Sequence, residues 1–138
     1  MIFEATVQYN TTNSKGKECV AKEKYVIENE TLFRIVENIM YNKFRDYQGV
    51  DVTAIRRTRI KEVVNQRTLV DDKVFMATLI DTFTDDDGVE KETKYDILFY
   101  AKDIDSAHSY IKDYVKQGYG MSIVSIKLTK YKDIIVCP

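Results

Sequence analysis

The chain has 138 residues, of which 44% are hydrophobic and 31% charged, a composition typical of a soluble globular protein. Basic and acidic residues nearly balance to a net charge of −1, so no overall field would draw the protein onto nucleic acid or a membrane. Because no apolar run approaches the roughly 18 residues of a membrane helix and Cys19 and Cys137 have neither metal-ligand nor disulfide-framework spacing, we expect a cytoplasmic protein without membrane contact.

The first half of the chain predicts the order strand, strand, helix, strand. Apolar and polar residues alternate over 3–9, which indicates a half-buried strand, and a turn at 13–16 leads into a return strand ending near Ile27. Asn29 is the expected N-cap of the helix that follows. The apolar positions of this helix are spaced three and four residues apart: Leu32, Ile35, Val36, Ile39 and Met40. One long strand is expected from Val52 to Val64.

The second half repeats this order at an offset of 72 residues, which lays Ile2–Val7 on Val74–Leu79. Its hairpin turns at Asp85–Gly88, Asp103 caps its helix, and its last strand begins near Ser122. Self-similarity at a fixed period is the signature of a duplicated architecture.

Together the halves predict an α+β fold built as a tandem ββαβ repeat. We expect a single domain, residues 1–138, with a first repeat over 1–65 and a second over 73–138. A single ββαβ unit has one helix to cover three strands, which leaves a small core. The repeats are therefore expected to pair edge to edge in a pseudo-twofold antiparallel or mixed sheet, with two helices on one face.

Three stretches carry a resemblance to a known family. They are Phe3–Tyr9, Ala54–Val63 and the hairpin Ala77–Leu98, which has Asp87–Thr93 at its turn. With these stretches the chain resembles a family of short uncharacterised proteins of Bacteroides and their phages, including crAss-like phages. This resemblance implies a cytoplasmic protein of a bacterial host that is associated with a phage or mobile element. It implies no activity, since the family is a domain of unknown function without established catalytic residues.

The inventory of reactive residues argues against catalysis and against a cofactor. The single histidine, His108, falls on the apolar stripe of the second helix and is expected to be packed there. The acidic run Asp85–Asp87 has consecutive acids followed by glycine, which favours a hairpin turn over a calcium loop. Gly16 and Gly88 belong to hairpin turns, so neither forms a phosphate-binding loop.

The sharpest enzyme hypothesis is a magnesium-dependent nuclease using Asp81, Glu92 and Lys94. Such enzymes hold Mg²⁺ between carboxylates and use it to position a water. Strand parity argues against this site, because Asp81 shares the apolar face of its strand whereas Glu92 and Lys94 alternate out of phase with the apolar residues of theirs. In an unbulged hairpin the two carboxylates would point to opposite faces.

The third strands carry the candidate binding residues. Arg57, Arg59 and Lys61 would share one strand face in the first repeat, and Lys130 and Lys132 are the equivalents of Arg59 and Lys61 in the second. Aromatic residues lie within or before these strands: Tyr47, Tyr119 and Tyr131. Cations that neutralise phosphates beside rings that stack on bases suit single-stranded nucleic acid. The competing interpretation is a solvated face whose charges protect a sheet edge.

The end of the chain suggests protein partners. Ile134–Val136 is apolar on both strand faces, which predicts either a covering helix or burial in an interface such as that of a homodimer. The function predicted first is therefore non-enzymatic binding of single-stranded nucleic acid, with Tyr131 as the stacking residue. The alternative is a protein-interaction or regulatory module, for example one that inhibits a host system.

Overall fold

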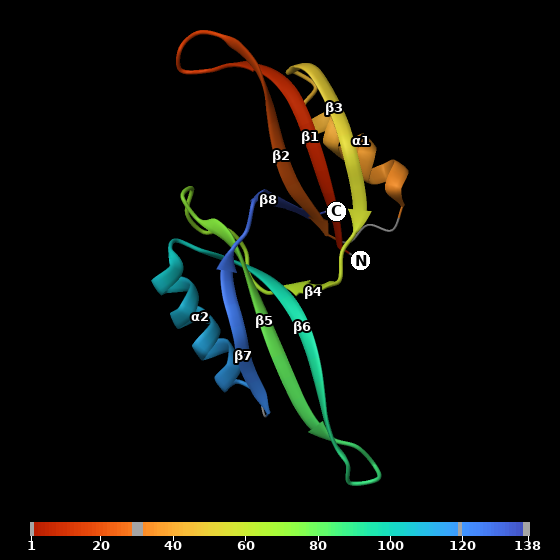
Figure 1. Ribbon diagram of the computed structural model, residues 1–138, viewed down its shortest axis with the longest axis vertical. Helices are drawn as coiled ribbons and strands as arrows, with labels where there is room; N and C mark the ends of the chain where they lie inside the picture. The colour runs from red at the N-terminus through yellow and green to blue at the C-terminus, as the bar shows by residue number, and fades with distance from the viewer. Residues whose placement is uncertain (1, 29–31, 119, 137–138) are drawn as a thin grey trace. The chain divides into compact units, whose positions relative to one another are not determined.

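The computed structural model describes residues 2–28, 32–118 and 120–136 and divides the chain into two compact units (Figure 1). Unit 1 contains Met1–Thr58 and Lys130–Pro138, and unit 2 contains Arg59–Thr129. The units therefore do not coincide with the sequence repeats. Each unit holds two strands and the helix of one repeat, most of that repeat's third strand, and the last strand segment of the other repeat.

Unit 1 is a four-stranded sheet with one helix. Its elements are β1 (Ile2–Thr12), β2 (Glu18–Glu28), α1 (Phe33–Lys43), β3 (Gln48–Arg57) and β8 (Tyr131–Val136). The strand order is β3-β1-β2-β8. The pairs β1–β2 and β1–β3 are antiparallel, whereas β2 and β8 run parallel.

Unit 2 has the same plan. Its elements are β4 (Ile60–Val63), β5 (Lys73–Thr84), β6 (Glu90–Ala101), α2 (Ile104–Lys116) and β7 (Met121–Leu128). The strand order is β4-β6-β5-β7, and β4 runs parallel to β6. Because β5, β6 and β7 are the repeat equivalents of β1, β2 and β3, the short strands β4 and β8 occupy equivalent edges.

One helix covers one face of each sheet, and the alternation of each strand supplies the buried side chains. The core of unit 1 consists of Phe3, Ala5, Val7, Tyr25, Ile27, Val36, Met40 and Phe44. The core of unit 2 consists of Phe75, Ala77, Leu79, Ile97, Phe99, Ala101, Ala107 and Ile111. The α+β class, the mixed sheets and the tandem ββαβ plan are thus confirmed, with the strands divided between two sheets instead of joined in one.

The two hairpins turn in the same way. The side-chain oxygen Oδ1 of Asn13 accepts hydrogen bonds from the backbone N–H groups of Lys15 and Lys17, at 2.9 and 3.0 Å. Asp85, its repeat equivalent, accepts from Asp87 and Val89 at 3.0 and 2.9 Å. The glycine of each turn has φ of +78°, a conformation that favours glycine. The predicted turn at Asp85–Gly88 is confirmed.

The predicted long third strand is wrong, because each third strand breaks at a threonine. The backbone N and Oγ1 of Thr58 both donate to the carbonyl oxygen of Ile2, each at 2.9 Å. Thr129 donates in the same way to Val74, at 3.1 Å from N and 2.7 Å from Oγ1. After each threonine the chain leaves one unit, and the following residues pair in the sheet of the other.

The structure confirms one of the two predicted helix N-caps and contradicts the predicted packing of His108. Asp103 caps α2 as predicted, accepting a hydrogen bond from the Ser106 N–H at 2.8 Å. Asn29 lies outside the described residues, and the N-cap residue of α1 is Leu32, which makes no side-chain cap bond. His108 is exposed, so the prediction that it packs in the core is wrong. Among the described residues, neither helix is long and apolar enough to cross a membrane.

The exchange of strand ends predicts that shortening the second repeat destabilises the unit built around the first. Deleting residues 130–138 removes β8, so the β2 amides that pair with it should lose their protection from hydrogen exchange, while β5–β6 amides in unit 2 keep theirs. Mass spectrometry of exchanging peptides measures both regions in one sample. A chain shortened only by residues 137–138 is the control, and selective loss of protection in unit 2 would contradict the exchange.

Candidate nucleic-acid interface

The predicted cations lie on the two segments where the chain passes between units. We call Arg56–Lys61 the first crossover and Lys127–Lys132 the second. Neither crossover contains Asp or Glu, and they are equivalent in the two repeats. Five of their cations were predicted to contact phosphates, and all five are exposed: Arg57, Arg59, Lys61, Lys130 and Lys132.

The structure separates some of these residues. Arg57 ends β3 in unit 1, whereas Arg59 and Lys61 belong to unit 2, so the three do not share the face of one continuous strand. Lys130 and Lys132 belong to unit 1. Within that unit β3 and β8 are opposite edges of the sheet, which places Arg57 and Lys132 on different edges.

Two of the cations lie over aromatic rings. The guanidinium carbon of Arg57 is 5.5 Å from the ring centroid of Phe33, and the Lys61 ammonium is 4.2 Å from that of Tyr95. Both distances are within the range of a cation–π interaction. Phe33 is 45% exposed and packs edge-on against Phe3, with 5.1 Å between ring centroids. Arg57 and Lys61 are therefore each held beside an aromatic ring.

Tyr131 is not a free ring but part of a polar cluster around buried Glu4. Its hydroxyl donates to Glu4 Oε2 at 2.7 Å. Arg56 Nη2 donates to the same oxygen at 2.8 Å, and Lys24 Nζ donates to Oε1 at 3.2 Å. The four side chains come from β1, β2, β3 and β8, so this cluster, which we call the Glu4 cluster, ties together all four strands of unit 1.

The electrostatics of the Glu4 cluster favour an ionised carboxylate. Burial alone would raise the pKa of Glu4, but the hydrogen bonds from Arg56, Tyr131 and Lys24 together lower it below its ordinary value. Burial, and then the bond to Glu4, raise the pKa of Tyr131, which stays a neutral donor. In unit 2 the equivalent positions are Met76, Asp96, Lys127 and Ile60, so the cluster is not duplicated.

Sequence reasoning missed two cavities that are lined by described residues, one in each unit. In unit 1 a cavity of about 380 Å³ lies between α1 and β3. It is lined by Phe33, Arg34, Glu37, Val52, Thr53, Ala54 and Ile55. The exposed ring of Phe33 thus borders both this cavity and the Arg57 guanidinium. Sequence reasoning did not single out Phe33, because no motif marks an isolated aromatic residue at the start of a helix as a binding residue.

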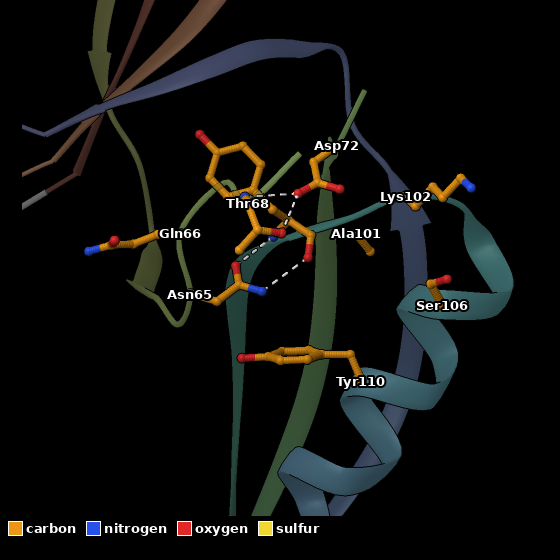
Figure 2. A pocket seen from close by; sticks show the side chains of 9 residues that line it. Asn65, Gln66, Thr68, Asp72, Ala101, Lys102, Ser106 and Tyr110 are labelled. Carbon is orange, nitrogen blue, oxygen red and sulfur yellow. Dashed lines mark hydrogen bonds between the residues drawn. The ribbon is translucent and has the colours of Figure 1, made fainter. Parts of the chain in front are cut away.

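The cavity in unit 2, of about 590 Å³, lies beside the segment that joins the repeats (Figure 2). The Asn65 side chain exchanges two hydrogen bonds with the Tyr100 backbone, at 2.7 and 3.0 Å, and so continues the pairing of β4 with β6. Asp72 Oδ2 accepts from the N–H groups of Thr68 and Leu69, each at 3.0 Å. Bonds from the Leu69 and Thr68 backbone lower the pKa of Asp72. These polar groups hold the joining segment in its folded shape.

The hairpin register separates the residues of the nuclease hypothesis. Asp81 lies opposite Thr93, while Glu92 lies opposite Thr82 and Lys94 opposite Ile80, with no register shift. Directly opposed residues share a sheet face, so Asp81 and Glu92 project from different faces of unit 2. Tyr119, one of the predicted aromatic residues, lies outside the described residues.

The sequence matches one family model over residues 1–137, the domain of unknown function DUF4494. The chain belongs to this family. No curated protein and no solved structure matches it. Because the DUF4494 description names no activity, the geometry of the crossovers and cavities carries the functional argument.

The Glu4 cluster predicts a stability difference that depends on pH. Glu4→Gln removes the charge that Arg56, Lys24 and Tyr131 bind, so unfolding free energy at pH 7 should fall by about 1–3 kcal/mol. Because the pKa of Glu4 is lowered on folding from the ordinary 4.5, the ionised carboxylate stabilises the folded state above that pH. Its contribution is lost as pH falls further, through the folded-state pKa.

Urea unfolding of the wild type and of Glu4→Gln between pH 7 and pH 2.5 measures this difference in unfolding free energy. Glu90→Gln is the matched control, since Glu90 is exposed at the start of β6 and its replacement should leave the free energy nearly unchanged. A Glu4→Gln difference that stays constant down to the lowest pH would show that the carboxylate charge is not what the cluster binds.

Proposed function

We propose that this protein binds single-stranded nucleic acid without catalysis, through the exposed cations of its two crossovers. The observation that carries the proposal is that both repeats place exposed Lys and Arg side chains, with no acidic residue, at the segment where the chain changes units. Arg59 and Lys61 match Lys130 and Lys132. Such cations bind phosphates by releasing the counterions that surround a strand, whatever its sequence.

Single strands suit these segments better than a duplex does. Reading a duplex usually places a helix in the major groove with basic side chains toward it. The crossover cations lie on strands and on the links between them instead of on a helix, and the start of α2 carries Asp103 and Asp105, which would repel phosphates. The proposal extends to the setting expected from the resemblance to proteins of Bacteroides and their phages: the cytoplasm of a bacterial host, as a protein of a phage or mobile element.

The Glu4 cluster gives Tyr131 a structural role in place of the stacking role expected from the sequence. Its half-buried ring and its hydroxyl bond to Glu4 anchor β8 in the sheet of unit 1. Lys130 and Lys132 flank this anchored residue. Tyr131 thus supports the second crossover by fixing the backbone from which its cations project.

A second candidate is a protein-interaction module, favoured by the exposed apolar residues of β7. Ile123, Val124 and Leu128 are 37%, 47% and 54% exposed on an edge strand of the unit 2 sheet. Edge strands with apolar side chains are templates for pairing with another chain. By contrast, the apolar end of the chain already has a partner within unit 1, because Ile134 and Ile135 pair with β2 and Ile135 packs against the core.

Fluorescence anisotropy of a labelled strand of ~20 nucleotides tests the proposal. If about five phosphates are neutralised, raising the salt from about 50 to 200 mM should weaken binding on the order of 100-fold. An apolar protein interface would be far less sensitive to salt.

The double variant Arg59→Glu, Lys130→Glu should weaken binding by at least about 10-fold, since it reverses one phosphate contact in each crossover. Lys15→Glu, Lys112→Glu makes the same change in net charge at two exposed lysines outside the crossovers. Equal weakening in both double variants, or no binding at low salt, would overturn the proposal. The second result would turn attention to β7.

A further inference from the structure

Resting on the proposed function, we propose that Phe33 and the adjoining cavity of unit 1 receive a nucleobase of the bound strand, with Arg57 and Arg34 taking the neighbouring phosphates. Phosphate contacts alone position a strand, but binding proteins for single strands also need aromatic faces on which bases stack. In unit 1 the Phe33 ring is an exposed aromatic surface that adjoins a crossover cation, Arg57.

The geometry around Phe33 meets the needs of a stacked base. The ring is 45% exposed, yet its edge contact with Phe3 at 5.1 Å fixes its orientation. A fixed ring loses little side-chain entropy when a base stacks on it. The adjoining cavity of about 380 Å³ lies between α1 and β3, beside this ring. A base that enters this cavity and stacks on Phe33 displaces the Arg57 guanidinium from the ring. Arg57 then binds a neighbouring phosphate of the strand.

The charges at the start of α1 also favour an anionic ligand. The first turn contains Arg34 and no acidic residue, and the N-cap Leu32 has no side-chain oxygen. The positive end of the helix dipole is therefore not opposed by a carboxylate in the first turn. Among the residues that line the cavity, Glu37 is the one acid and Arg34 the one cation, and Arg57 lies over the Phe33 ring beside it. In the second repeat Asp103 and Asp105 make the equivalent helix start acidic.

Tyr47, another exposed aromatic residue of unit 1, is less suited to this role. Tyr47 precedes β3, which pairs with β1 from Asn10–Gln48 to Phe3–Arg57, so it lies at the opposite end of the strand from Arg57. The nine residue-to-residue steps from Gln48 to Arg57 put about 30 Å between these ends. Tyr47 contacts Tyr9, whose hydroxyl donates to Glu23 at 2.9 Å, so a carboxylate lies close to that ring cluster.

The chain contains no tryptophan, so Phe33→Trp would place one fluorophore at the proposed stacking position. Its emission should be quenched as an unlabelled oligothymidylate of ~20 nucleotides saturates the protein, because a base stacks on the indole. Tyr47→Trp is the matched control at an exposed ring of the same unit, and its emission should not change. Quenching of Tyr47→Trp alone would overturn the inference.

Affinity gives an independent readout. Phe33→Leu keeps an apolar contact with Phe3 but loses the ring, so affinity should fall by about 5- to 150-fold, the equivalent of one stacked base. Phe33→Tyr keeps the ring and should bind like the wild type. Circular dichroism melting confirms that each variant is folded, and the Phe33→Trp quenching does not depend on the leucine variant.

The outcomes distinguish this inference from the function on which it rests. Wild type should bind an abasic strand, which has the phosphates without the bases, as weakly as Phe33→Leu binds the normal strand. If the protein binds both strands equally, with steep salt dependence and no effect of Phe33→Leu, the crossover function stands and the base site is refuted. If no strand binds at low salt, both fail.

Discussion

The structure depends on a reciprocal exchange of strand ends between two copies of one motif. β8 completes the sheet built on the first repeat, and β4 completes the sheet built on the second. Both exchanged strands run parallel to their partner, and a parallel neighbour cannot be supplied by a tight turn from that partner. Thr58 and Thr129 end the antiparallel pairing at the same point of each repeat by donating twice to one carbonyl. In this structure each repeat takes the fourth strand of its sheet from the other repeat.

The exchange also decides which features are duplicated and which are singular. Both crossovers carry exposed cations because they are the same structural element used twice. The Glu4 cluster and the Phe33 surface belong to unit 1 alone, since Met76 replaces Glu4 and Asp105 replaces Phe33 in the second repeat. In the proposed function, the duplicated cations contact the phosphates of any strand, and the Phe33 surface offers the bound strand a place for one base.

Patterns of neighbouring residues in the sequence correctly predicted the features that local interactions determine, namely the buried faces of strands and the hairpin turns. Alternation placed Phe3 and Phe75 in their cores, and a glycine after Asn13 or Asp85 fixed the hairpin turns. The strand breaks could not be predicted in this way, because the residues on both sides of Thr58 continue a strand-like pattern. Glu4 occupies a polar position of an alternating strand, and its burial follows from three cationic or hydroxyl partners on other strands. Phe33 lies outside the apolar stripe predicted for its helix, and only the packing of α1 on β3 shows that its ring borders a cavity.

The exchange itself is tested most directly by nuclear Overhauser effects between backbone protons in the isotope-labelled protein. The account predicts contacts between β2 and β8, such as Val26 with Ile134, and between β4 and β6, such as Val63 with Leu98. Contacts of residues 60–63 with β2, together with contacts of residues 131–136 with β6, would mean that each repeat completes its own sheet. That result would contradict the exchange and the crossovers on which the proposed binding surface is built.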